Sequence, residues 1–205
     1  MRGGPNPTPR AYCHRAEPHE QDGRNRHMRA ALLTLLLVFG SCAPQPVYRR
    51  SEAPLPVASI DLGRFLGLWY EQARLPNRFE YGCQVVTVRY ARHDGGVSMT
   101  NTCTDLAGDE RVAHGRARLV GEGKFEVSAF GPFWSDHWVL DRGADYSWAI
   151  VGEPDGKYLW VLTRQPQITP EQRAAFEQKI RALGYRPADL VWAAQSDDDL
   201  VQSES

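Results

Sequence analysis

The chain has 205 residues, of which 42% are hydrophobic and 24% are charged, and its formal net charge is −1. This balance is that of a globular protein with one domain and an appendage, and it gives no excess of positive charge for a nucleic-acid partner. The six tryptophans and eight tyrosines are flat amphipathic groups that suit strands and ligand cavities.

The N-terminal region indicates export. Residues 30–39 form a nearly continuous apolar run, which is too short for a spanning helix but matches the hydrophobic region of a secretory signal. With the small residues that precede Cys42, segment 28–41 resembles a bacterial lipoprotein signal, which implies that Cys42 is lipidated. The alternative is ordinary signal cleavage that leaves a free thiol at Cys42.

Two segments flank this signal. Residues 1–27 are rich in Pro, Gly, Arg and His without periodicity, so they are interpreted as a mis-set start ahead of Met28 or as a leader. Residues 42–59 contain four prolines and no apolar period. They are predicted to form a semi-extended tether that lifts a domain, residues 60–195, off a membrane surface.

Short strands separated by turn signals follow from Cys83 to Leu162. Alternating apolar residues and Gly-containing turns predict seven of them, close to residues 86–90, 97–101, 112–119, 125–129, 138–140, 146–151 and 158–163. Sequential hairpins of this kind indicate an up-and-down meander, and closing it into a barrel removes the exposed sheet edges.

One helix is predicted after the strands. Thr169 and Gln172 form a capping box around Pro170, and Gly184 ends the helix. Phe176, Ile180 and Leu183 form a single apolar stripe that would pack against the barrel. Residues 190–192 could add a last short strand, and 196–205 form an acidic tail that is expected to be disordered.

The cysteines predict one disulfide. Cys13 lies in the leader and Cys42 is the lipidation candidate, which leaves Cys83 and Cys103 in an oxidising compartment. They flank the first hairpin at similar distances from its turn, although a bulge would be needed to perfect the register. Two free buried thiols are the alternative.

Three ordered motifs resemble those of the lipocalin family. Gly67-Leu68-Trp69-Tyr70 matches the family's Gly-x-Trp-Tyr signature, Ala144-Asp145-Tyr146 stands where the family has Thr-Asp-Tyr, and Arg164 matches the third motif. Other segments, Ala73–Pro76, Arg78–Glu80, Phe130–Phe133 and Tyr158–Leu162, resemble the bacterial outer-membrane lipocalins. The resemblance covers residues 58–195 and implies an all-β fold, an eight-stranded antiparallel up-and-down β-barrel with one C-terminal α-helix packed on its side.

The resemblance also implies roles for the motif residues. Trp69 would close the barrel floor, with the Arg164 guanidinium across its indole face, and Gly67 would let the backbone bend there. Tyr70, Asp145 and Tyr146 complete this floor motif, which is structural and says little about cargo.

Strand alternation predicts the wall of a ligand cavity, because an eight-stranded barrel has room for one small ligand. The inward residues are expected to be Val86, Val88, Tyr90, Met99, Asn101, Phe125, Val127, Ala129, Trp160 and Leu162. Strand 146–151 is ambiguous, since Trp148 and Ile150 alternate with the apolar Ala149 and Val151. A tightly packed barrel without a usable cavity is the alternative.

The expected function is binding, storage or transport of fatty acids, lysophospholipids or similar amphiphiles by an outer-membrane lipoprotein of a Gram-negative envelope. No enzyme, cofactor or metal is expected, because hydrolase, zinc, phosphate-loop and Cys-x-x-Cys motifs are missing from the sequence. A structural lipoprotein without ligand, a thiol-dependent isomerase and a haem carrier using His114 or His137 remain alternatives. His114 is expected to face outward because its small neighbours face inward. The family also includes dimers, so a homodimer is possible.

Overall fold

The computed structural model describes residues 44–129 and 131–193, all within one compact unit, Ala43–Ser205. The predictions for residues 1–27, the signal peptide, Cys42 and the tail 196–205 lie outside the described residues. Among those described, no helix is long and apolar enough to cross a membrane.

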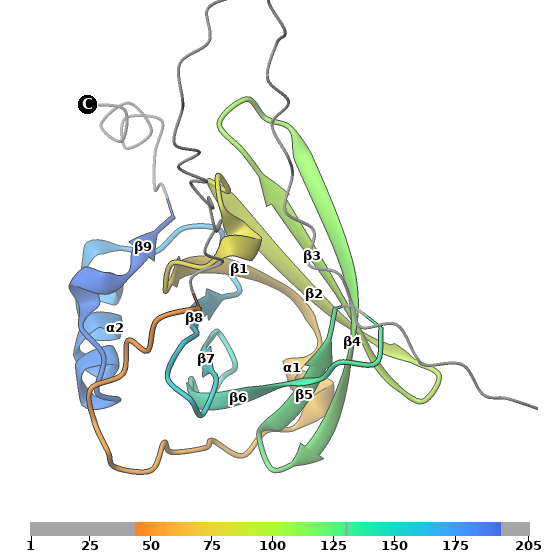
Figure 1. Ribbon diagram of the computed structural model, residues 1–205, viewed down its shortest axis with the longest axis horizontal. Coiled ribbons are helices and arrows are strands. Elements are labelled where there is room, and N and C mark those ends of the chain that lie inside the picture. The colour runs from red at the N-terminus through yellow and green to blue at the C-terminus, as the bar shows by residue number, and fades with distance from the viewer. Residues whose placement is uncertain (1–43, 130, 194–205) are drawn as a thin grey trace, which may run out of the picture. The chain divides into compact units, whose positions relative to one another are not determined.

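Eight antiparallel strands close into a barrel, as predicted (Figure 1). They are β1 (Gly67–Arg74), β2 (Val85–His93), β3 (Gly96–Thr104), β4 (Glu110–Gly121), β5 (Lys124–Ser128), β6 (Ser135–Arg142), β7 (Trp148–Gly152) and β8 (Leu159–Thr163). Each strand pairs with its sequence neighbour, and β8 and β2 both pair with β1, which closes the sheet. The short β9 (Val191–Trp192) adds to β1.

The helical elements lie at the barrel's ends and side. The four-residue α1 (Leu62–Phe65) precedes β1, η1 (Arg78–Glu80) follows it, and η2 (Pro187–Asp189) precedes β9. The long helix α2 (Pro170–Ala182) has the predicted capping box, with Pro170 at its first turn. Gly184, with φ of +90°, follows its C-cap Leu183 and ends it as predicted.

Two cores share the barrel wall. One fills the barrel interior around Phe65, Trp69 and Phe125. The other lies between the wall and α2, where Phe176 and Ile180 pack on outward residues of β7 and β8. Because β7 is apolar on both faces, the sequence could not predict which face points into the barrel. The structure turns Ala149 and Val151 inward and Ile150 towards α2.

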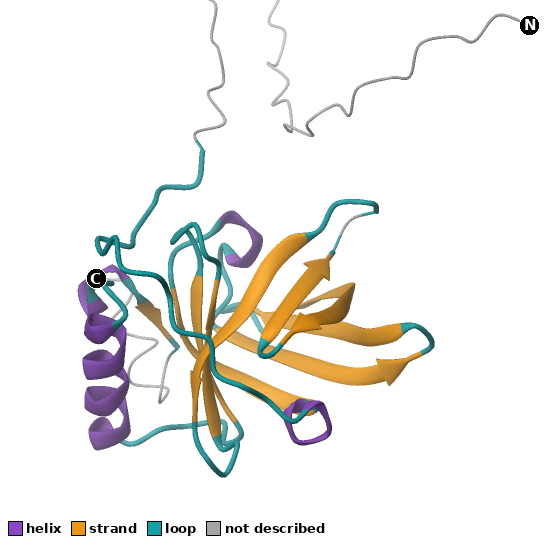
Figure 2. Cartoon of the chain, turned by 90° about the horizontal axis from the view of Figure 1, so that it is seen from below, coloured by secondary structure: helices purple, strands orange, loops and turns teal. Residues whose placement is uncertain are grey.

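Alternating connections define two barrel ends. The mouth carries the loops that join β1 to β2, β3 to β4, β5 to β6 and β7 to β8, which are residues 75–84, 105–109, 129–134 and 153–158. The floor carries α1 and the turns between the remaining strand pairs. The two ends can be followed in Figure 2, where the strands run between them and α2 flanks one side.

Residues 44–59 do not form the spacer that their composition predicted. The amides of Tyr48 and Arg49 donate to the Gly156 carbonyl at 3.0 and 3.2 Å, and the Arg50 amide donates to the Gly184 carbonyl at 2.9 Å. Further along, the Ala58 amide donates to the Val139 carbonyl at 2.8 Å. This segment, here called the strap, runs along the barrel from the mouth past α2 to α1 (Figures 1 and 2).

Candidate functional site

The barrel floor is closed by Arg164 and Trp69. The Arg164 guanidinium carbon lies 3.5 Å from the centre of the indole ring, and the indole N–H donates to the Phe65 carbonyl at 2.8 Å. Gly67 has φ of +106°, and a Cβ there would lie 3.3 Å from Arg164 Nη1. Glycine is therefore required both by the backbone conformation and by the approach of the guanidinium.

The second motif forms a corner beside this floor. Tyr146 adopts a φ of +63° and its ring lies between the guanidinium carbons of Arg64 and Arg142, each 4.3 Å from the ring centre. Its hydroxyl accepts from the Asp61 amide at 2.6 Å. The exposed carboxylate of Asp145 accepts hydrogen bonds from the backbone amide and the hydroxyl of Ser147. The hydrogen bond from the amide is the main reason that the pKa of Asp145 is lowered. Tyr70 is half-buried.

Most residues predicted to line the interior do face it. Val88, Tyr90, Met99, Phe125 and Leu162 belong to the buried interior core, with the partly buried Val127 and Trp160 packed against it. Val86 is buried beside the disulfide, and half-buried Asn101 pairs with Val88 and Ala113. Ala129 is different. It follows the last residue of β5 and is exposed, because the alternation that placed it inside ends with the strand.

The two candidate histidines face opposite ways. His114 is exposed on β4 and lies 3.3 Å from the Thr100 hydroxyl, as its small inward neighbours predicted. His137 points into the barrel, where its Nε2 hydrogen-bonds the Tyr90 hydroxyl at 3.1 Å. Burial lowers the pKa of His137 to about 4 and raises that of Tyr90. The pair is therefore neutral at physiological pH.

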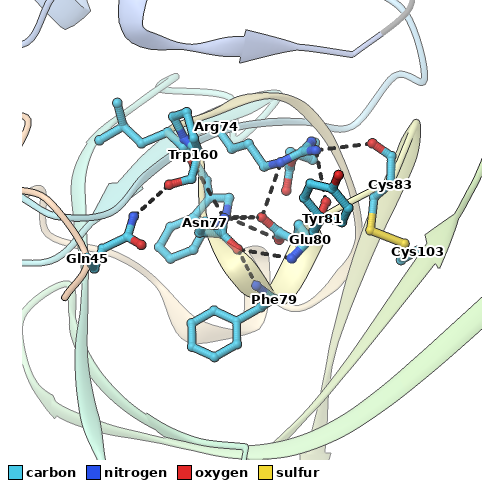
Figure 3. Close-up of polar contacts among 12 residues, drawn as sticks. Gln45, Arg74, Asn77, Phe79, Glu80, Tyr81, Cys83, Cys103 and Trp160 are labelled. Atoms are coloured by element: carbon cyan, nitrogen blue, oxygen red, sulfur yellow. Dashed lines mark hydrogen bonds and ion pairs between the residues drawn. A yellow bond between two sulfur atoms is a disulfide. The ribbon is translucent and has the colours of Figure 1, made fainter. Parts of the chain in front are cut away.

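A buried ionic network lies at the mouth, and sequence analysis did not find it (Figure 3). Arg74 Nη1 lies 2.9 Å from Glu71 Oε1, and Arg74 Nε lies 3.5 Å from Glu80 Oε2. Arg74 also donates to the carbonyls of Glu80 and Cys83, and the Trp160 indole N–H donates to the Glu80 carboxylate.

Two carboxylates share the single guanidinium of Arg74. Burial raises the pKa of Glu71 well above its usual value, and the nearby Glu80 raises it further, whereas Arg74 lowers it only partly. The network holds the mouth loop 75–84 to the inner wall and places polar groups at one end of an apolar chamber. Among the described residues, no group of three or more His, Cys, Asp or Glu side chains could hold a metal.

The predicted disulfide joins Cys83 and Cys103, whose Cα atoms are 5.3 Å apart. The expected bulge is not used, since β2 and β3 pair in continuous register from Val85 to His93. Instead, Cys83 precedes β2 in the mouth loop and reaches diagonally to Cys103, which stands opposite Val86. The bond therefore fixes loop 75–84 to β3.

Comparisons with known proteins agree with this architecture. A family model described as a lipocalin-like domain matches residues 60–195. The chain is 36% identical over 176 residues to "Outer membrane lipoprotein Blc" of Vibrio cholerae, covering 82% of this chain and 99% of that protein. It is 32% identical over 171 residues to the protein of the same name in Escherichia coli K12, covering 81% and 94%.

The fold has solved counterparts as well. Insecticyanin from the tobacco hornworm Manduca sexta superposes with a TM-score of 0.57 at 21% identity, covering 75% of this chain and 89% of that one. The motif geometry, the closed eight-stranded barrel and the family match together show that the chain belongs to the lipocalin family.

Proposed function

We propose that this lipocalin binds an amphiphile with a long acyl chain, such as a fatty acid or lysophospholipid, inside its barrel. The observation that carries the proposal is an apolar inner wall that stays accessible towards the mouth. Ala113, Val127 and Trp160 face inward by strand register yet are exposed or only half-buried, whereas the wall near the floor is fully buried. Each methylene that enters such a wall gains about 0.8 kcal/mol before ordering costs.

The polar network supports one orientation of the ligand. Phe65, Trp69 and Phe125 are fully buried at the floor, whereas Glu71, Arg74 and Glu80 surround the mouth end. An acyl chain directed at the floor would leave its head group beside these charged side chains, where hydrogen-bond partners are available. The isomerase alternative needs a free thiol, and the disulfide uses both barrel cysteines.

We further propose that the protein is a lipoprotein of the Gram-negative outer membrane, anchored through acyl chains on Cys42. The relatives that are 32–36% identical carry the name outer membrane lipoprotein. The apolar run 30–39 and Cys42 have the order of a lipoprotein signal, and Ala43 follows where Asp would retain the protein in the inner membrane. Two or more acyl chains make such attachment effectively stable.

The ligand is tested with residues 43–205, which contain every barrel strand and α2. Lipids extracted from the purified protein are identified by mass spectrometry, and binding of a fluorescent fatty acid is titrated. We expect co-purified acyl lipids and saturable probe binding. A barrel that is empty and also ignores fatty-acid and lysolipid probes would contradict the proposal.

A matched pair of variants locates the binding site. Ala113 and Val112 are neighbours on β4 that face opposite sides of the sheet. Ala113→Trp places an indole in the mouth half of the interior and should weaken probe binding at least about tenfold, while Val112→Trp places the same side chain outside and should not. Equal effects of the two would mean that the probe binds elsewhere.

The anchor is tested separately in a Gram-negative host. The full chain should incorporate radiolabelled palmitate and fractionate with the outer membrane, and Cys42→Ala should abolish both. Incorporation that survives Cys42→Ala would show that Cys42 is not the lipidated residue.

A further inference from the structure

The strap begins at the mouth of the barrel. The Gln45 side-chain amide donates to the Pro76 carbonyl at 2.6 Å, in mouth loop 75–84 (Figure 3). Three residues later the Tyr48 amide donates to Gly156, in mouth loop 153–158. The strap reaches the floor only at its far end, where Ala58 lies against Gly123, and just beyond it the Asp61 amide donates to the Tyr146 hydroxyl. The described chain therefore starts beside the open end.

Chain length then restricts where an anchor can be attached. Cys42 precedes Pro44 by two residues, and consecutive Cα atoms are about 3.8 Å apart, so their Cα atoms are separated by no more than about 8 Å. An acyl group on Cys42 would start near the mouth and not near the floor. The strap leaves no long spacer between anchor and barrel.

The mouth loops expose large apolar side chains. Phe79 is 55% exposed and Tyr81 84% exposed, both in the loop that Gln45 contacts. Two other mouth loops carry Leu106, 53% exposed, and Phe133, 67% exposed. The floor turns at 94–95, 122–123 and 143–147 carry none of the large exposed apolar side chains, although Leu119 and Val120 are exposed on β4 beside one of them. Exposed acidic residues occur at both ends, for example Asp94 and Glu122 at the floor and Asp109 and Asp155 at the mouth. Aromatic and aliphatic groups gathered at one end of a molecule mark an interaction surface.

Arginines accompany these aromatic groups. The Arg78 guanidinium carbon lies 5.3 Å from the centre of the Phe79 ring, and Arg111 Nη2 donates to the Tyr81 carbonyl at 2.7 Å. Arg116 reaches the Phe133 loop, where it lies 5.7 Å from the Trp134 ring. Aromatic side chains flanked by cations suit the bilayer interface, where rings enter the boundary and guanidinium groups meet anionic phosphates.

We propose that the mouth docks on the bilayer that carries the anchor, through Phe79 and Tyr81 with Leu106 and Phe133 around them. The barrel then opens onto the lipid surface, and an amphiphile passes between bilayer and barrel without crossing bulk water. This inference rests on the proposed function for the anchor position and the nature of the ligand. The occupant of the surface is a phospholipid bilayer with an anionic component.

The docking test fixes the anchor chemically, so that it does not depend on natural lipidation. In a protein of residues 42–205, Cys42 is the one free thiol, because Cys83 and Cys103 are joined. It is coupled to a maleimide phospholipid in vesicles of phosphatidylcholine with a minor fraction of phosphatidylglycerol. Hydrogen–deuterium exchange is compared with that of the same protein capped with N-ethylmaleimide and free in solution.

We expect exchange in loop 75–84 to slow by about tenfold on the vesicles, while the floor turns at 94–95 and 122–123 are unchanged. The double variant Phe79→Ser, Tyr81→Ser should lose this protection. Val120→Ser removes an apolar side chain, 52% exposed, from β4 next to a floor turn. This control variant should retain the protection of loop 75–84. Protection of the floor turns, or none at either end, would overturn the proposal.

Docking and ligand binding can fail independently. If the fatty-acid probe does not bind but loop 75–84 is protected, the ligand proposal fails and docking stands. If the probe binds and that loop exchanges at the same rate in both states, the docking proposal fails alone.

Discussion

Arg164 and Trp69 form a stacked pair in which the guanidinium also donates to several backbone carbonyls. Arg164 Nη1 donates to the Leu68 carbonyl at 2.7 Å, and Nη2 reaches the carbonyls of Arg64, Phe65 and Leu66. These carbonyls lie at the C-terminal end of α1 and just beyond it, where a cation is favoured. The pair thus joins the end of β8 and the start of β1 to α1, the short helix at the barrel floor.

We expect Arg164→Ala to lower the free energy of unfolding by about 2–4 kcal/mol, because it removes the cation–π contact and leaves several carbonyls without donors. Arg164→Lys keeps the charge without the planar fork and should lose about half as much. Trp69→Ala should cost about 3–5 kcal/mol. Urea unfolding followed by circular dichroism measures each value.

A second Arg–Trp pair supplies the control. The Arg173 guanidinium carbon lies 4.4 Å from the Trp192 ring centre, but this side chain is exposed on α2. Arg173→Ala should therefore cost no more than about 1 kcal/mol. If Arg164→Ala and Arg173→Ala lowered the free energy of unfolding by similar amounts, the contacts of Arg164 at the floor would add nothing beyond what an exposed Arg–Trp contact contributes. Fatty-acid binding should change less than stability in all these variants.

The disulfide should stabilise the fold and keep the mouth loop in place. It closes a segment with a sequence separation of 20 residues, so replacing both cysteines with alanine should lower stability by about 3 kcal/mol. Loop 75–84 should then exchange amide hydrogens faster, because Cys83 no longer joins it to β3. Two titratable thiols in denatured, unreduced protein of residues 43–205, in which Cys83 and Cys103 are the two cysteines, would contradict the bond.

Stability should fall with acid because of His137. Its pKa is about 4 in the fold and about 6.5 in the unfolded chain, so the unfolded state binds more protons between these values. The contribution is fully present above pH 6.5 and is lost as the pH falls towards 4, with a total of about 3 kcal/mol. His137→Gln, which keeps a partner for Tyr90, should flatten this part of the urea-stability profile. An unchanged slope would assign the acid loss to other groups.

Glu71 should act in the opposite direction. Its pKa is raised in the fold by burial, so between the unfolded and the folded pKa the native state binds more protons than the unfolded chain. This contribution is present at low pH and is lost as the pH rises from about 4.5 through the raised value. Glu71→Gln keeps an acceptor for Arg74 and should remove this decline, which makes the variant relatively more stable at neutral pH. A wild-type decline that persists in Glu71→Gln would exclude Glu71 as its source.

Local patterns were sufficient to predict most of the fold. The alternating strands from Val85 onward and the capping box of α2 depend on neighbours in sequence. β7 was ambiguous because its two faces are buried against different cores, so no polar residue marks an outer side. The strap was not predicted because it binds through backbone hydrogen bonds, which leave no apolar period.

The polar part of the candidate site was hidden for a different reason. The pairing of β1 with β8 shifts register between Glu71 and Ala73, so strict alternation cannot place Glu71 and Arg74 on one face. The structure does so with one extra residue, Gln72. His137 was missed as an inward residue because Val139 and Leu140 are both apolar and gave β6 no clear direction.

Two glycines test whether the strap contributes to stability. Gly156 has φ of +72°, and a Cβ there would lie 2.5 Å from the Arg49 Cβ, whereas Gly95 has φ of +84° and nothing within 4 Å of such a Cβ. Both Gly→Ala changes carry a similar backbone cost of about 1–2 kcal/mol, but only Gly156→Ala also displaces the strap. We expect Gly156→Ala to be the less stable by a further 1–3 kcal/mol or so, and to allow protease cleavage within residues 44–58. Equal stabilities, with that segment resistant in both variants, would mean that the contact with Gly156 does not hold the strap.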